Sequence, residues 1–166
     1  MSVSATLLAS LLAATLHVGD TAPDFTARDS DGQPVALAKL IEAGPVLLAF
    51  FPKAFTPGCT DELRGLTARG KDLERYGARV VAISGDDAAT LQRFKTELKA
   101  PFTFLPDPEG TLMRLYDVKA PVVTLAKRTT FLITRKRVVA DITTGSDAIR
   151  VENALRALDK LGAAGL

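Results

Sequence analysis

The feature that most constrains the fold is an uninterrupted apolar run at residues 45–51, Pro-Val-Leu-Leu-Ala-Phe-Phe, which is followed by Pro52. A run of this length without polar alternation is typical of a β-strand that is covered on both faces. Proline lacks the backbone N–H that a sheet ladder requires, so we expect the strand to end at Pro52. The chain must therefore supply helices for both sides of a sheet.

The rest of the sequence alternates between helix and strand patterns. Apolar residues recur at helical spacing between 63 and 76, and Gly77 closes that segment as a C-terminal glycine should. Such alternation implies a three-layer α/β domain with a central mixed β-sheet flanked by helices. The other predicted elements are strands at 78–84, 102–105, 128–135 and 138–143, and helices at 87–99, 112–116 and 149–161.

Length and composition fit one globular domain, which we expect to span residues 17–166. The chain has 166 residues, 47% hydrophobic and 24% charged, which suffices to bury a core without disulfides. Its 21 basic and 19 acidic residues give a net charge of +2, which argues against a nucleic-acid-binding protein. The densest basic cluster, at 135–137, is predicted to be a solvated hairpin turn.

The first sixteen residues have a different character and are expected to form an apolar extension, residues 1–16. The stretch 7–14 resembles the apolar core of a secretory signal, but no Lys or Arg precedes Arg28, whereas such signals normally begin with one. The run is also too short to span a bilayer. We therefore expect a cytoplasmic protein with an extension, and a periplasmic one if this segment acts as a signal.

The only cysteine, Cys59, stands where the helix after the apolar strand is predicted to begin. A thiol in the first turn of a helix faces unpaired N–H groups and the positive end of the helix dipole, both of which favour the nucleophilic thiolate. A lone cysteine is more often a small buried hydrophobe. The residues around Cys59 argue against that interpretation.

Pro52, Thr56 and Cys59 form the pattern Pro-x-x-x-Thr-x-x-Cys, and here the sequence resembles the peroxiredoxins, thiol enzymes that reduce hydroperoxides. The string Thr-Pro-Gly-Cys-Thr-x-Glu at 56–62 is most similar to the bacterioferritin-comigratory, or Q-type, branch. Several spaced matches are harder to obtain by chance than one motif. The resemblance implies a thioredoxin-like fold. It continues across roughly residues 17–162, at 18–25, 84–86, 101–102, 107–110 and 128–133.

The resemblance implies a role for each of five residues. Cys59 would be the peroxidatic nucleophile, Thr56 would contact the thiolate and the peroxide, and the Arg128 guanidinium would lie beside the sulfur. Pro52 would shield the sulfur from water, and Glu62 would help to hold the arginine. Without the resemblance, these last four residues would be interpreted as an N-cap, a surface cation, a strand terminator and a solvated helix carboxylate.

The sequence departs from the Q-type pattern in one important respect. Many members place a resolving cysteine five residues after the first, where this chain has Arg64. Oxidised Cys59 would then be a sulfenic acid that an external thiol must reduce, which is a one-cysteine mechanism. The reductant could be thioredoxin, glutaredoxin with glutathione, or a small thiol, and the protein could be a monomer or a homodimer.

Two other functions remain as alternatives. A thiol-disulfide oxidoreductase would need a Cys-x-x-Cys pair, but the second position is Glu62, and Thr129 stands where a cis-proline would be expected. A non-catalytic redox-sensing or binding module of thioredoxin fold would use Cys59 as a signalling thiol. With one histidine, His17, and one cysteine, the chain offers no credible zinc or iron site, and no cofactor is expected.

Overall fold

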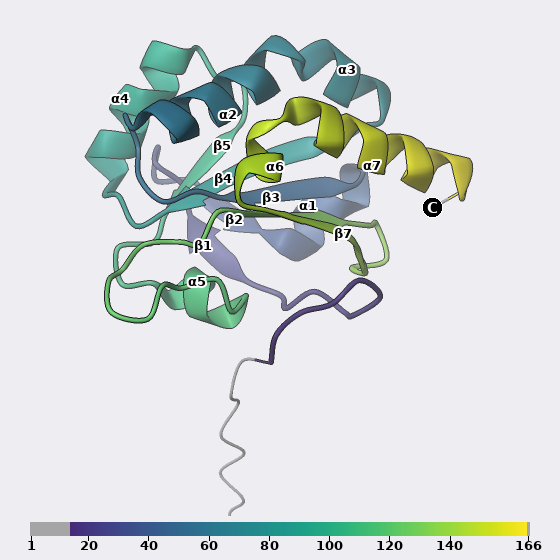
Figure 1. Ribbon diagram of the computed structural model, residues 1–166, viewed down its shortest axis with the longest axis horizontal. Coiled ribbons are helices and arrows are strands. Elements are labelled where there is room, and N and C mark those ends of the chain that lie inside the picture. The colour runs from purple at the N-terminus through teal and green to yellow at the C-terminus, as the bar shows by residue number, and fades with distance from the viewer. Residues whose placement is uncertain (1–13, 166) are drawn as a thin grey trace, which may run out of the picture.

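The computed structural model describes residues 14–165, which form a β-sheet between two layers of helices (Figure 1). The predicted extension at 1–16 lies mostly outside the described residues and stays a prediction. The elements, in chain order, are β1 (Thr26–Arg28), β2 (Pro34–Ala36), α1 (Leu37–Ala43), β3 (Val46–Phe50), α2 (Pro57–Ala68), α3 (Gly70–Arg75), β4 (Arg79–Ser84), α4 (Ala88–Leu98), β5 (Thr103–Pro106), α5 (Thr111–Leu115), β6 (Thr129–Ile133), β7 (Val139–Thr144), α6 (Ser146–Ile149) and α7 (Val151–Ala163).

The main sheet is mixed, as predicted, with the strand order β5-β4-β3-β6-β7. The apolar run forms the central strand β3, and all five of its residues are buried. It pairs in parallel with β4 and antiparallel with β6, so that Phe50 lies opposite both Ile83 and Thr129. The end of β3 therefore meets the beginning of β6.

Alternate residues of β3 point into two separate cores. Leu47 and Ala49 pack with the apolar side chains of α2, α4 and α7. Val46, Leu48 and Phe50 pack on the opposite face with those of α1 and α5. Figure 1 shows these helices on the two sides of the sheet. The continuous apolar run is thus explained by burial on both faces of the strand.

Two predicted helices are each divided in the structure. The segment 63–76 belongs to α2 and α3, which are separated at Arg69, and Gly77 then follows α3 with a φ of 64°. The closing helix is divided into α6 and α7 at Arg150, whose ψ of 104° is extended. Leu73 of α3 packs in the same core as α2, so apolar periodicity continues across the first break, whereas α6 contributes no buried residue to that core.

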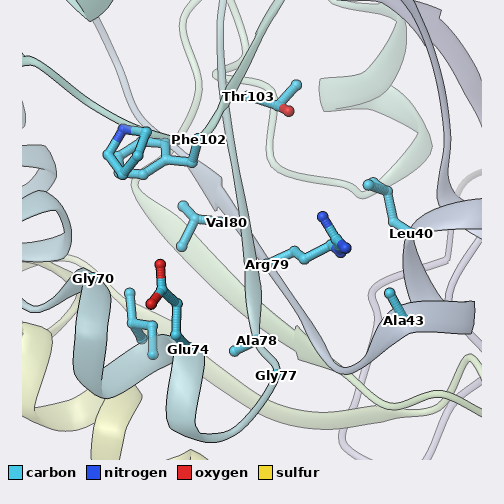
Figure 2. Close-up of a pocket in the computed structure, with 12 residues that line it drawn as sticks. Leu40, Ala43, Gly70, Glu74, Gly77, Ala78, Arg79, Val80, Phe102 and Thr103 are labelled. Atoms are coloured by element: carbon cyan, nitrogen blue, oxygen red, sulfur yellow. The ribbon is translucent and has the colours of Figure 1, made fainter.

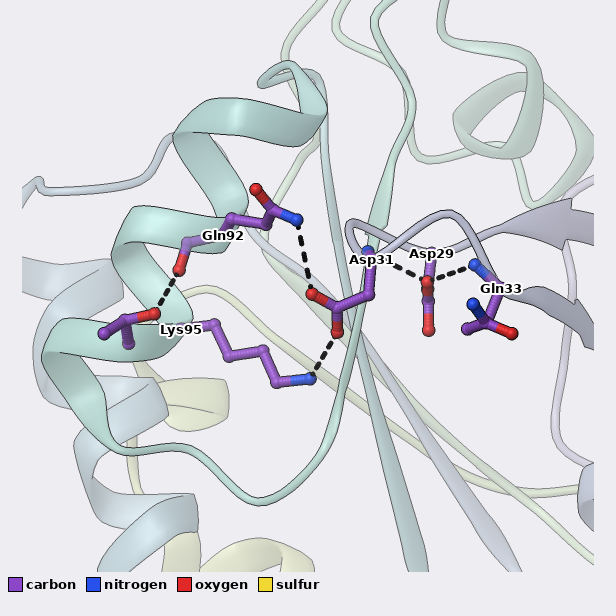
Figure 3. Close-up of polar contacts among 6 residues, drawn as sticks. Asp29, Asp31, Gln33, Gln92 and Lys95 are labelled. Carbon is purple, nitrogen blue, oxygen red and sulfur yellow. Dashed lines mark hydrogen bonds and ion pairs between the residues drawn. The ribbon is translucent and has the colours of Figure 1, made fainter.

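The sequence analysis did not predict β1, β2 and α1. These strands have three residues each and form an antiparallel hairpin. The Asp29 carboxylate accepts hydrogen bonds from the N–H groups of Asp31 and Gln33 in the turn, and Asp31 reaches Lys95 of α4 at 3.1 Å (Figure 3). Lys95 lowers the pKa of Asp31 through this hydrogen bond and its charge. The pair is partly exposed, so it joins the hairpin to α4 but contributes little to the stability of the fold.

A pocket of about 360 Å³ lies where β4 and β5 begin, and Glu74, Arg79 and Phe102 are among its lining residues (Figure 2). Arg79 is opposite Val46 at the start of β3. Cys59 follows the other end of β3, so this pocket is separate from the cysteine.

Gly85 is predicted to be essential for the packing of the loop that leads to β6. A Cβ at this position would lie 2.5 Å from the backbone oxygen of Thr124, so the Gly85→Ala variant must displace that loop. We expect its free energy of unfolding to fall by about 1–3 kcal/mol, measured by urea denaturation. The control is Gly162→Ala in α7, where a Cβ would meet no atom within 4 Å. An unchanged Gly85→Ala variant would contradict this packing.

Candidate active site

Helix α2 places Cys59 in its first turn, as the sequence predicted. Thr56 is the N-cap residue, with extended φ and ψ of −83° and 149°, and Pro57 occupies the first helical position. Proline is favoured there because its missing N–H would have no partner in the helix. Cys59 is 1% exposed, so the sulfur is enclosed by the fold.

Arg128 reaches the sulfur from a segment 69 residues away in sequence. It immediately precedes β6, and Thr129 pairs with Phe50 at the end of β3. Its Nη2 donates a hydrogen bond to Cys59 Sγ at 3.3 Å, and its Nη1 donates to Glu62 Oε2. The side chain is only 14% exposed. One guanidinium therefore joins the thiol and a carboxylate.

The interpretation of Glu62 as a solvated carboxylate is wrong, because its side chain is fully buried. Its Oε1 has no hydrogen-bond partner among the described residues. Burial raises the pKa of Glu62 to about 7, although the charge and the hydrogen bond of Arg128 act in the opposite direction. Burial disfavours the charge of Arg128 as well, but Glu62 and Cys59 outweigh it and raise the pKa of Arg128.

Thr56 occupies the N-cap position but does not cap the helix with its side chain. Its Oγ1 donates instead to the carbonyl oxygen of Lys53 at 2.8 Å. Within the described residues, Thr56 and Cys59 share no side-chain hydrogen bond, and the contact implied by the resemblance stays a prediction. The donated proton leaves the lone pairs of the hydroxyl oxygen free to accept a hydrogen bond.

The loop between β3 and α2 is held by two residues that the sequence analysis did not assign to the site. Asp86 accepts hydrogen bonds from Ala54 N–H at 2.8 Å and from the Ser84 hydroxyl at 2.7 Å. Phe55 has a φ of 63°, which is unusual for a bulky residue, and its ring packs on Phe94 at 4.9 Å. The segment 84–86 was part of the resemblance, but the resemblance did not place Asp86 at the site. No sequence signal indicates the left-handed conformation of Phe55.

The remaining predicted residues lie around this site. Pro52 follows β3 directly and is half-buried, which fits the end of the strand, while its shielding role stays a prediction. Arg64, which stands where many of the resembling sequences have a resolving cysteine, is exposed on the surface of α2. Within residues 14–165, no three His, Cys, Asp or Glu side chains are grouped as metal ligands. No helix in this range is long and apolar enough to cross a membrane.

The site combines a buried thiol at a helix start, one guanidinium and one buried carboxyl group, with the Thr56 hydroxyl at the N-cap of the same helix. The guanidinium can stabilise negative charge on sulfur and on a second atom beside it. This arrangement suits a nucleophilic thiolate that attacks a small polar substrate.

Comparisons with known proteins find similarity to the AhpC/TSA family and to peroxiredoxins. The profile of the AhpC/TSA family matches residues 18–142. A chloroplastic peroxiredoxin Q of Oryza sativa subsp. japonica is 38% identical over 122 residues, which cover 73% of this chain and 56% of the rice protein. A putative peroxiredoxin of Mycobacterium tuberculosis is 35% identical over 130 residues, covering 76% of this chain and 84% of that protein. The chain thus spans little more than half the length of the plant relative.

Solved structures show the same fold. Peroxidoxin BcpB from Mycobacterium tuberculosis superposes with a TM-score of 0.81 at 33% identity, covering 87% of this chain and 97% of that one. The bacterioferritin comigratory protein of Xanthomonas campestris gives a TM-score of 0.78 at 23% identity, covering 88% and 97%. The second likeness concerns the fold alone.

The buried carboxyl group predicts a pH dependence of stability. Because its pKa is about 7 in the folded protein and 4.5 ordinarily, Glu62 binds more protons in the folded state than in the unfolded state over this range. Stability should therefore fall as the pH rises from 4.5 to about 7. The loss is at most about 3 kcal/mol.

Urea unfolding across this pH range should show the loss of stability in the wild type and not in Glu62→Gln. Glutamine has nearly the shape of the protonated Glu62 side chain but cannot ionise. Asp61→Asn removes an exposed carboxylate from the same helix and should behave like the wild type. Parallel pH profiles for the wild type and Glu62→Gln would contradict the assignment.

Proposed function

The chain belongs to the AhpC/TSA family, and within it to the peroxiredoxin Q branch, and we propose that it is a thiol-dependent peroxidase that reduces hydrogen peroxide and organic hydroperoxides. The observation that carries this proposal is the hydrogen bond from Arg128 Nη2 to Cys59 Sγ at the start of a helix. A permanent cation and a helix dipole both stabilise the thiolate that the reaction needs. Cys59 is the proposed nucleophile.

The first half-reaction breaks the O–O bond of the peroxide. The Cys59 thiolate attacks one oxygen, an S–O bond forms, and the other oxygen leaves with the electron pair of the O–O bond. That oxygen takes up a proton and departs as water or an alcohol, while the sulfur is oxidised to sulfenic acid. Arg128 stabilises the negative charge as it moves from sulfur to the leaving oxygen.

Thr56 and Pro52 are proposed to orient the peroxide. The Thr56 hydroxyl gives its proton to Lys53, so its lone pairs can accept the peroxide O–H and hold the molecule in line with the sulfur. Pro52 presents no N–H at the end of β3 and restricts water near the sulfur. Glu62 holds Arg128 through the Nη1 hydrogen bond.

The second half-reaction needs a thiol from outside the chain, because Cys59 is the only cysteine in the sequence. One thiol attacks the sulfenic acid, releasing water and forming a mixed disulfide with Cys59. A second thiol then attacks the sulfur of the first, which releases the Cys59 thiolate and joins the two external thiols in a disulfide. We propose thioredoxin, glutaredoxin with glutathione, or a small thiol as the reductant. The cytoplasm is the proposed compartment, and the active form is a monomer or homodimer.

Substitutions at the site should distinguish the roles proposed for Cys59, Arg128 and Thr56. Cys59→Ser should abolish peroxide turnover, because a serine hydroxyl is a poor nucleophile at neutral pH. Arg128→Ala and Thr56→Val should each slow sulfenic acid formation by about 10²–10³, measured by stopped flow, since each removes a preorganised polar group. Thr56→Ser should retain the rate. Arg64→Ala is the control, and an Arg128→Ala variant as fast as the wild type would exclude the proposed role of that arginine.

Gly58 should be required for the position of the guanidinium. A Cβ there would lie 3.2 Å from Arg128 Nη2, whereas a Cβ at Gly65 of the same helix would make only ordinary contacts, at 3.6 Å, with Val151. We expect Gly58→Ala to slow peroxide reduction at least about tenfold, and Gly65→Ala to leave the rate unchanged, because misplacement of a catalytic group by a fraction of an ångström is costly. Equal rates in the two variants would show that Arg128 adjusts freely.

The missing resolving cysteine predicts overoxidation. Without reductant, repeated peroxide should convert Cys59 to sulfinic acid, detected by intact mass, because the sulfenic acid has no partner in the same chain. An added thiol should prevent this and appear as a mixed disulfide. A covalent dimer that forms stoichiometrically at low protein concentration would instead indicate resolution between two chains.

A further inference from the structure

The site contains two groups that can carry negative charge and one cation between them. Arg128 Nη2 contacts Cys59 Sγ, and Arg128 Nη1 contacts Glu62 Oε2. Cys59 is 1% exposed, and the Glu62 side chain is fully buried. Cys59 and Glu62 are three residues apart on α2, so their side chains are neighbours on one helix face.

No second cation within the described residues contacts either group. The helices packed against α2 are α3, α4, α6 and α7, and its buried side chains share a core with apolar residues of the strands. The charged side chains of these helices are exposed, apart from two half-buried ones that are paired elsewhere. Asp72 of α3 pairs with Arg69, and Lys95 of α4 pairs with Asp31. The charge balance at Cys59 and Glu62 therefore depends on Arg128.

A single guanidinium can neutralise only one of these two anions. If both were ionised, the buried cluster would carry a net negative charge, which a low-dielectric interior strongly disfavours. If both were protonated, Arg128 would be a buried cation without a counter-charge. The neutral cluster holds one proton on the pair.

The unpartnered oxygen of Glu62 indicates where that proton can reside. Oε2 accepts the hydrogen bond from Arg128, and Oε1 has no partner within residues 14–165. A carboxylate concentrates charge on both oxygens, so leaving one of them unpartnered is costly, whereas a neutral acid tolerates it better. Burial also raises the pKa of Glu62 to about 7, which likewise favours the protonated carboxyl group.

We propose that Cys59 and Glu62 share one proton across Arg128, and that the reactive form of the site is the one in which Glu62 holds it. The exchange moves a proton from the thiol to the carboxylate and leaves the net charge of the cluster unchanged, so burial does not oppose it. Glu62 is then a positioning residue for charge, which acts on Cys59 through Arg128. The inference rests on the proposed function, because the reactive form is the one that would attack peroxide. The experiment that tests it uses no peroxide.

Proton release on blocking the sulfur, compared between the wild type and Glu62→Gln, tests the proposal. Methyl methanethiosulfonate forms a neutral methyl disulfide with a thiolate and releases methanesulfinate, which takes up no proton at neutral pH. Once Cys59 is neutral, Arg128 has only Glu62 to balance its charge, so Glu62 should ionise. We expect about one proton released per Cys59 in the wild type, measured with a pH indicator in weak buffer.

Glu62→Gln provides the decisive comparison. The Gln amide oxygen can still accept from Arg128, but the side chain has no proton to lose, so this variant should release none while reacting at least as fast as the wild type. Its rate should rise with pH in one step, whereas the wild type should show two steps, as a coupled pair does. Asp61→Asn, an exposed neighbour on α2, should keep both wild-type properties.

Three results would overturn the proposal. No proton release from the wild type would mean that Glu62 is already ionised beside the thiolate, and one proton released from Glu62→Gln as well would mean that the proton came from the Cys59 thiol. If Glu62→Gln reacts with the thiosulfonate more slowly than the wild type at every pH, the ionised carboxylate of Glu62 is needed to hold Arg128 in place. Neither measurement uses peroxide, so failure of the peroxidase function would be seen separately, as a wild type that shares a proton but does not turn over hydrogen peroxide.

Discussion

The contact between the Arg128 guanidinium and the Cys59 sulfur depends on the antiparallel pairing of β3 with β6. Phe50 and Thr129 are opposite each other in that pair, so the residue before β6 is brought to the helix that follows β3. A one-residue shift of this register would turn the side chains of β6 to the opposite face. The burial of β3 on both faces makes such a shift costly, and the packing of the core thereby fixes the distance at the site.

The residues around the thiol are rigidly supported on both sides. Asp86, two residues after the end of β4, holds the backbone of the β3–α2 loop, and Phe55 keeps a left-handed conformation with its ring on Phe94. Residues held in sparsely populated conformations occur often at functional sites, where the surrounding structure compensates for the strain. In this chain the compensation comes from a carboxylate and an aromatic contact. The thiol environment is therefore a property of the parallel strands β3 and β4 as well as of helix α2.

The buried state of Glu62 changes how the site has to be understood. Glu62 lies two residues before the exposed Arg64 on α2, and nothing in the sequence around it indicates that its carboxylate is buried. In the fold, it is enclosed with Arg128 and Cys59 and has one unpartnered oxygen. A cluster with one cation and two potential anions has a protonation state that no single residue determines.

Sequence alone predicted the buried central strand, the mixed sheet, most of the later helices and strands, and the helix start at Cys59, because periodicity, proline and glycine act locally along the chain. It also determined that the chain has one cysteine and no second cysteine that could resolve its sulfenic acid. The three-residue strands β1 and β2, the breaks at Arg69 and Arg150 and the φ of Phe55 were not predictable, since each is set by packing with distant segments. The position of Arg128 was expected only from the resemblance. Its contact with Cys59, the hydroxyl direction of Thr56 and the burial of Glu62 were decided by the tertiary structure, because charge and hydrogen-bond partners depend on which segments the sheet brings together.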